Sequence, residues 1–109
     1  MKSVATRRFW DLLHALPPDI QELAVKNYYL WLRSPNHPSL HFRRLKGSTN
    51  RFSIRIGSHH RALGDLHSGA VRWVWIGTHE EYNRLVRTGQ ASFSHVQVGS
   101  RASYPPELV

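Results

Sequence analysis

The side chain best placed for proton transfer is His79, which stands where a strand-like run gives way to helix-forming residues. Residues 71–76 are apolar or aromatic at nearly every position, as in a strand buried on both faces. Gly77 ends this run, and Thr78 is suited to cap a following helix whose first turn is acidic, with Glu80 and Glu81. Histidine is the usual acid–base residue of enzymes, so His79 fits either proton transfer or a hydrogen bond to its own helical turn.

Two arginines and a tyrosine are expected near this junction. Arg55 fits a phosphate contact or a solvated arginine on the polar face of a strand. Arg61 fits a phosphate contact or a structural ion pair, with three carboxylates as candidate partners: Asp65, Glu80 and Glu81. Tyr82 fits a functional group or a rim aromatic with a packed ring and a wet hydroxyl. These three residues and His79 are the candidate catalytic set.

The chain is strongly basic, with 15 Lys and Arg against 7 Asp and Glu and a formal net charge of +8. Arginines far outnumber lysines, and arginine forms bidentate contacts with phosphate and carboxylate. The partners to weigh are therefore nucleic acid and an acidic protein. The expected nucleic-acid-binding residues, which also fit a solvated basic face, are Arg43, Arg44, Lys46 and Arg51.

The sequence predicts neither a metal nor another cofactor. It has no cysteine, which excludes disulfides and thiolate ligands. His37 and His41 have helical ligand spacing, but Pro38 lies between them and no helix is expected there. The sequence shows no apolar run of about 18 residues and no signal-peptide pattern, so we expect a cytoplasmic protein without a membrane contact.

Hydrophobic periodicity predicts two helices, from Thr6 to Ala15 and from Pro17–Pro18 to Arg33, joined as an antiparallel hairpin. A loop at 34–39 and a short extended or irregular segment ending at Gly47 follow. Three strand-like runs, 51–57, 60–66 and 70–77, predict an antiparallel meander. A last helix begins near Thr78 and ends before Gly89.

The predicted fold class is α+β, with the helical hairpin packed on a three-stranded antiparallel sheet. Residues 1–88 are expected to form one domain, and 89–109 a partly flexible tail with room for a small strand at 93–98. Trp73 and Trp75 are expected in the core, because their strand is central.

Three segments in this order, SPNHPSLHFRRLKG, FSIRIGSHHRALG and IGTHEEYNRLV, together with the helical hairpin, resemble the RelE/ParE toxin superfamily of bacterial type II toxin–antitoxin systems. The resemblance spans roughly residues 9–86. It implies a RelE-like fold and a small antitoxin partner. RelE-like members cleave mRNA on the ribosome without a metal, whereas ParE-like members inhibit DNA gyrase without nuclease chemistry.

The resemblance carries over residue by residue with departures. The family's two strand lysines fall on Ser53 and Arg55, and its second-strand arginine falls on Arg61. His79 replaces the arginine after the third strand, and Tyr82 stands earlier than the family tyrosine. The family's N-terminal strand is not expected, since the first helix starts almost at once.

Metal-independent RNA cleavage needs activation of the ribose 2′-OH, cations on the phosphate and an acid for the leaving oxygen. One histidine and two arginines meet this minimum. The first hypothesis is therefore a ribosome-associated mRNA endoribonuclease toxin. The alternatives are a ParE-like gyrase inhibitor and a solitary toxin-fold protein without nuclease activity, both favoured by the missing lysines.

Overall fold

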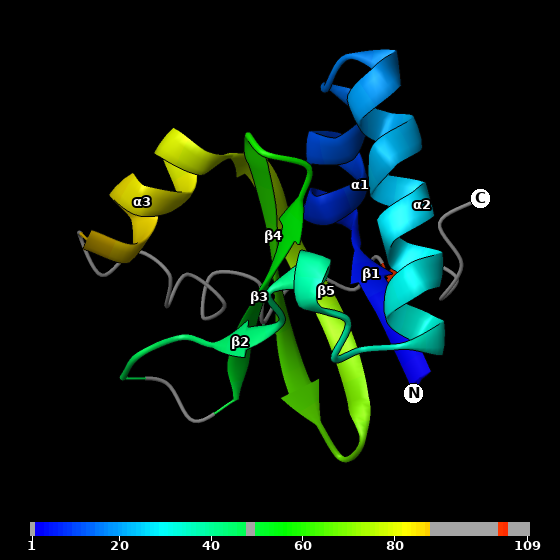
Figure 1. Cartoon of the computed structure of the whole chain (residues 1–109), viewed down its shortest axis with the longest axis vertical. Helices are drawn as coiled ribbons and strands as arrows, with labels where there is room; N and C mark the ends of the chain where they lie inside the picture. Colours follow the sequence, from blue (N-terminus) through cyan, green and yellow to red (C-terminus); the bar gives the residue numbers. More distant parts are fainter. Residues whose placement is uncertain (1, 48–49, 88–102, 105–109) are drawn as a thin grey trace.

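A mixed β-sheet separates a helical hairpin from the last helix (Figure 1). The computed structural model describes residues 2–47, 50–87 and 103–104. The sheet order is β2-β3-β4-β5-β1-β6. The elements in chain order are β1 Lys2–Thr6, α1 Arg7–His14, α2 Pro18–Arg33, the 3₁₀ turn η1 Pro38–Leu40, β2 Arg43–Arg44, β3 Arg51–Ile56, β4 His60–His67, β5 Ala70–Thr78, α3 His79–Arg87 and β6 Ser103–Tyr104.

The predicted helical hairpin is confirmed, with both helices on one face of the sheet. Thr6 caps α1, because its Oγ1 accepts a hydrogen bond from the Phe9 amide over 3.2 Å. Pro18 stands in the first turn of α2, where its missing N–H leaves no helical bond unmade. The apolar stripes predicted for both helices face the sheet and bury Phe9, Leu13, Ala24, Tyr28 and Trp31.

The predicted meander is also confirmed, because β3, β4 and β5 pair antiparallel in sequence order. The turn between β4 and β5 needs two residues with positive φ, Ser68 at 51° and Gly69 at 78°. Glycine adopts this backbone region without steric cost, which explains Gly69. The meander fixes the cross-strand partners of Arg51, Arg55, Arg61 and Asp65.

The prediction of a purely antiparallel, three-stranded sheet is wrong, and so is the expected absence of an N-terminal strand. Residues 2–6 form β1, which pairs parallel with β5. Short strands β2 and β6 extend the sheet at its two sides. The sequence did not predict β1 because KSVAT is short and largely polar. The buried Ser3 hydroxyl forms a hydrogen bond with the Tyr28 hydroxyl at 2.7 Å.

Trp73 and Trp75 are both in the core, as predicted, but they lie on opposite faces of the sheet. The register between β4 and β5 shifts at Leu63 and Gly64, which leaves one extra residue, Val74, on β5. Trp73 therefore packs under the hairpin, and Trp75 joins the cluster beneath α3. Gly77 does not end the strand. A larger residue at position 77 would clash with the Trp75 indole, because a Cβ built on Gly77 would lie 2.6 Å from the nearest indole atom.

The expected tail strand at 93–98 and the expected flexibility of 89–109 fall almost wholly outside the described residues. Among the helices that the structure describes, none combines the length and the apolar composition needed to cross a bilayer.

Candidate functional site

Two arginines lie side by side on the sheet face opposite the hairpin. Arg55 of β3 and Arg61 of β4 are register partners, so their side chains leave the same face of the sheet. Both are half-buried. In the described part of the chain neither guanidinium pairs with a carboxylate, so the ion pair weighed for Arg61 is not formed. Asp65, one of the three partners weighed for it, binds other arginines instead.

The first turn of α3 contacts one member of this pair, Arg61. The Arg61 guanidinium carbon lies 5.1 Å from the centroid of the Tyr82 ring, in cation–π contact. The His79 ring stacks on the same tyrosine, with the ring centroids 6.2 Å apart and the planes 20° apart. Tyr82 and Leu85 pack on the apolar cluster beneath α3. Tyr82 therefore lies at the edge of the core as well as in the candidate site. The candidate catalytic residues are thus brought together.

A capping box fixes the start of α3. Thr78 Oγ1 accepts from the Glu81 amide over 3.1 Å, and a Glu81 carboxylate oxygen accepts from the Thr78 amide over 2.9 Å. The His79 amide donates to the His59 carbonyl oxygen over 2.7 Å, which ties α3 to the turn between β3 and β4. Thr78 and Glu81 therefore supply the capping that was weighed for His79, whose imidazole is exposed.

A second histidine, His41, stands at the other side of the arginine pair. It follows η1 in the left-handed region, with φ 48° and ψ 48°, which is uncommon for a residue other than glycine. Its Nε2 lies 3.5 Å from Nη1 of Arg55. Partial burial, and after it the charges of Arg55, Arg43 and Arg61, lower the pKa of His41 below 6.5. These effects favour the neutral form of the imidazole.

Sequence reasoning weighed His41 only as a metal ligand with His37. The one local signal was its position two residues before the basic run, in a segment with no periodicity to place it. Its proximity to Arg55 depends on the pairing of β2 with β3 and on the backbone turn after η1, which only the folded chain shows.

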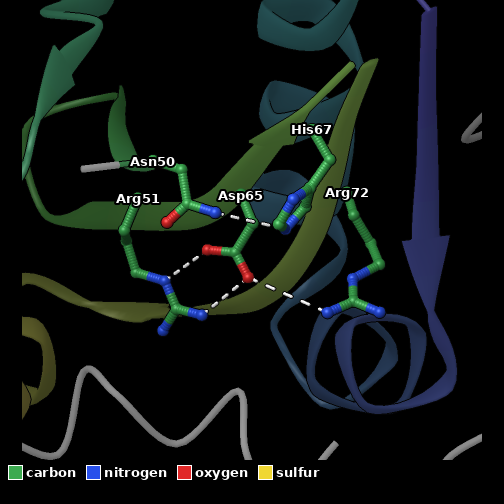
Figure 2. A network of polar contacts seen from close by, with 5 residues as sticks. All are labelled: Asn50, Arg51, Asp65, His67 and Arg72. Carbon is green, nitrogen blue, oxygen red and sulfur yellow. Dashed lines mark hydrogen bonds and ion pairs between the residues drawn. The ribbon is translucent and has the colours of Figure 1, made fainter. Parts of the chain in front are cut away.

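Arg51, expected at a nucleic-acid surface, is 4% exposed and belongs to a separate cluster at the other end of the same face. Figure 2 shows Arg51 and Arg72 converging on the Asp65 carboxylate. Nε and Nη2 of Arg51 donate to the two oxygens over 2.5 and 2.8 Å, while Nη2 of Arg72 lies 3.9 Å away. Beside them, Nδ2 of Asn50 lies 3.2 Å from Nε2 of His67. This geometry gives Arg51 a structural role.

The remaining basic residues expected to bind nucleic acid are exposed. Arg43 pairs with Ser53 across β2 and β3, so it shares a face with Arg55, whereas Arg44 pairs with Phe52 and leaves the opposite face. Lys46 follows β2 at the edge of the sheet. Arg43 is thus the residue of the basic run that extends the site.

Ser53, which stands at the place of one family lysine, is 3% exposed. A side chain so short and so deeply buried adds no charge to the site. Across residues 2–47, 50–87 and 103–104 no three histidine, aspartate or glutamate side chains gather closely enough to hold a metal ion.

Comparison with known proteins identifies similar folds. A family model described as a ParE-like toxin domain matches residues 18–84. The toxin in the RelB–RelE antitoxin–toxin complex of Methanococcus jannaschii is similar in structure, with a TM-score of 0.60, 15% identity, and coverage of 73% of this chain and 94% of that chain.

Two further solved toxins share the fold. The YoeB/ParE toxin of Agrobacterium tumefaciens has a TM-score of 0.59 and 24% identity, and covers 72% of this chain and 99% of its own. The isolated RelE toxin of E. coli has a TM-score of 0.57 and 18% identity, with coverage of 80% and 96%. No curated protein sequence matches the chain.

Proposed function

The chain belongs to the ParE-like toxin domain family, and from this we propose that it is a metal-independent endoribonuclease that cleaves mRNA on the ribosome. Membership makes it a RelE/ParE-type toxin of a toxin–antitoxin system. The RelE-like fold, with its sheet and three helices, is common to the solved toxins. The chemistry assigned to this member rests on its own site.

The observation that carries the proposal is the pair of uncompensated arginines flanked by two histidines. Arg55 and Arg61 are half-buried cations with no carboxylate partner in the described residues, so an anionic ligand would gain their full attraction. Guanidinium groups bind phosphate through bidentate hydrogen bonds, and they stabilise charge that develops on phosphoryl oxygens. Imidazoles beside them supply the proton transfers.

Each residue then has a definite role. Arg55 and Arg61 hold the scissile phosphate, and His79 exchanges a proton with the reacting oxygens. Tyr82 positions Arg61 through its ring and supports His79 by stacking. Arg43, Arg44 and Lys46 attract the RNA backbone from the edge of the sheet. Arg51 stabilises the fold through Asp65 and takes no part in binding.

The proposed natural inhibitor is a small antitoxin. The Methanococcus jannaschii relative is seen as a complex with its RelB antitoxin. The net charge of +8, and the lack of a carboxylate contact at Arg55 and Arg61 among the described residues, favour an antitoxin segment that carries carboxylates to the site.

A second candidate is inhibition of DNA gyrase without RNA cleavage. It is favoured by the ParE-like description of the family model and by Ser53, since the site holds one cation fewer than the ribonuclease pattern. A toxin fold without activity is the third outcome of the same experiment.

The test is induced expression of the full chain in bacteria, with primer extension on cellular mRNA and plasmid supercoiling read in parallel. Cleavage between codons that is abolished in Arg61→Ala and His79→Ala supports the proposal. Relaxed or broken DNA with intact mRNA would overturn it in favour of gyrase inhibition. Normal growth with folded protein would indicate a chain without either activity.

Arg72→Gln is the matched control for these variants. Arg72 lies on the same sheet face and is also partly exposed, but it sits beside the Asp65 carboxylate at the far end. Its replacement removes one positive charge and leaves Arg55 and Arg61 in place. The control should therefore cleave mRNA like the unmodified chain.

A further inference from the structure

We infer that His41 is the general base of the site, accepting the ribose 2′-OH proton on Nε2 while Arg55 and Arg61 hold the phosphate. This inference rests on the proposed ribonuclease function and adds to it a second proton-transfer group. It is carried by the position of His41 against the arginines, by its backbone conformation and by the order of strands across the site.

The contact with Arg55 indicates which nitrogen of the ring carries the lone pair. Nη1 of Arg55 lies 3.5 Å from Nε2 of His41, at the outer limit of a hydrogen bond. A guanidinium can only donate, so Nε2 faces it as an acceptor and the proton of the neutral ring is on Nδ1. The lone pair of a neutral imidazole therefore points at the arginine that holds the phosphate.

The backbone at His41 indicates that this placement is enforced. The left-handed conformation is sterically unfavourable for a residue with a Cβ, and here it follows directly on the turn formed by Pro38–Leu40. Leu40 is fully buried, which anchors the turn against the core. Strain of this kind persists where the surrounding structure holds a side chain in one place.

The strand order sets the two histidines on either side of the phosphate-binding pair. His41 precedes β2, and His79 follows β5, while Arg55 and Arg61 lie on β3 and β4 between them. In-line displacement at phosphorus needs the base on the attacking side and the acid on the leaving side. His41 and His79 meet this requirement as base and acid respectively.

His41 Nε2 takes the proton of the 2′-OH, the 2′-oxygen bonds to phosphorus, and the bond from phosphorus to the 5′-oxygen breaks. The 5′-oxygen takes a proton from the His79 imidazolium. The products are a 2′,3′-cyclic phosphate and a 5′-hydroxyl end, and solvent then returns both histidines to their starting states.

The local charges favour the base role. The charged groups that face His41 are Arg43 of β2, Arg55 of β3 and Arg61 of β4, and together with partial burial they lower its pKa. A bound phosphate offsets these positive charges. The affinity of His41 for a proton therefore rises when substrate is present, which is when the proton must be taken.

The experiment uses the purified full chain, a short RNA cleaved by it, and the variant His41→Asn. Asparagine tolerates the left-handed backbone, but it does not titrate. We expect the cleavage rate to fall by about 10²–10⁴-fold, in the range of general-base catalysis. The rise in cleavage rate with pH on the acidic side of the profile should also disappear. His14→Asn, an exposed histidine on α1, is the control and should cleave normally.

A second measurement follows the His41 imidazole by NMR in the unmodified chain. Adding the same oligonucleotide with a 2′-deoxyribose at the cleavage position should raise the pKa of His41. A normal rate and pH profile in His41→Asn, with cleavage still dependent on His79 and Arg61, would overturn the base role alone. Failure of the unmodified chain to cleave RNA, free or on ribosomes, would overturn the proposed function and the base role together.

Discussion

The two ends of one sheet face hold arginines in opposite circumstances. At one end Arg51 is buried, and the Asp65 carboxylate binds it through two hydrogen bonds with Arg72 close by (Figure 2). At the other end Arg55 and Arg61 have no carboxylate partner among the residues described. The two pairs of cross-strand neighbours, 51 with 65 and 55 with 61, are separated by only four residues along each strand.

The two ends therefore differ in the role of their arginines: one arginine stabilises the fold, and the other two are proposed to bind a ligand. A buried cation is stable only with a counter-charge, and Asp65 supplies it within the chain. At the site end no carboxylate of the described residues contacts Arg55 or Arg61, and the counter-charge proposed for them is a phosphate or an antitoxin carboxylate. Substitutions at each end test whether the first end determines stability and the second end determines activity.

The largest expected effect is on stability, at the neutralised end. Asp65→Asn removes the carboxylate charge that buried Arg51 contacts, and breaking a buried pair in this way lowers the free energy of unfolding by about 3–5 kcal/mol. Chemical denaturation of the purified variant measures the loss. Arg72→Gln, at a more distant and partly exposed contact, should cost less than about 1 kcal/mol. An Asp65→Asn variant as stable as the unmodified chain would contradict the structural role of this end.

Activity should respond at the other end. Arg61→Gln removes a phosphate-binding cation, which should lower the RNA cleavage rate by about 10²–10³-fold, as for loss of one donor that stabilises transition-state charge. Its only cost to stability in the described contacts is the Tyr82 cation–π interaction, worth about 0.5–1 kcal/mol at an exposed site. Cleavage assays and denaturation on the same preparation test both. A large loss of stability with normal cleavage in Arg61→Gln would contradict the assignment of Arg61 to activity.

The sequence predicted the parts of this arrangement that depend on local patterns. Apolar periodicity placed both hairpin helices and the three central strands, and turn residues set the cross-strand neighbours that bring Arg55 beside Arg61. The Thr78 cap followed from its position ahead of two glutamates, and the structure adds the reciprocal bond from Glu81. Each of these features is decided by residues close in sequence.

The features that were missed depend on distant pairing. Strand β1 forms because it pairs parallel with β5, some 70 residues away, and its own sequence is too polar to predict a strand. The opposite faces of Trp73 and Trp75 follow from the extra residue opposite Leu63 and Gly64. The partner of Asp65 is Arg51 rather than Arg61 because one lies directly across the strand and the other does not.

A smaller effect is expected where the junction holds the site together. Thr78→Ala removes one bond of the capping box, and loss of such a cap costs about 0.5–2 kcal/mol. Because His79 and Tyr82 are in the first turn of α3, fraying of that turn should also lower the rate of RNA cleavage. Arg72→Gln, in contrast, should leave the cleavage rate unchanged. Thr78→Ser retains the hydroxyl and should behave like the unmodified chain in both assays. Loss of stability without any loss of cleavage would show that the cap does not position the site.

The smallest effect is on the pH dependence of stability, and it belongs to the site end. The pKa of His41 is lowered by partial burial and three arginines, and that of His60 by burial and His59 against the opposing pull of Glu81 and Asp19. Since both folded-state values lie below 6.5, the unfolded chain binds these protons first as the pH falls, and stability decreases from about pH 7 toward pH 5. His41→Asn should make the denaturation midpoint less dependent on pH over this range. Stability that rises on acidification would show that the cations at the site end do not act on His41 as the geometry requires.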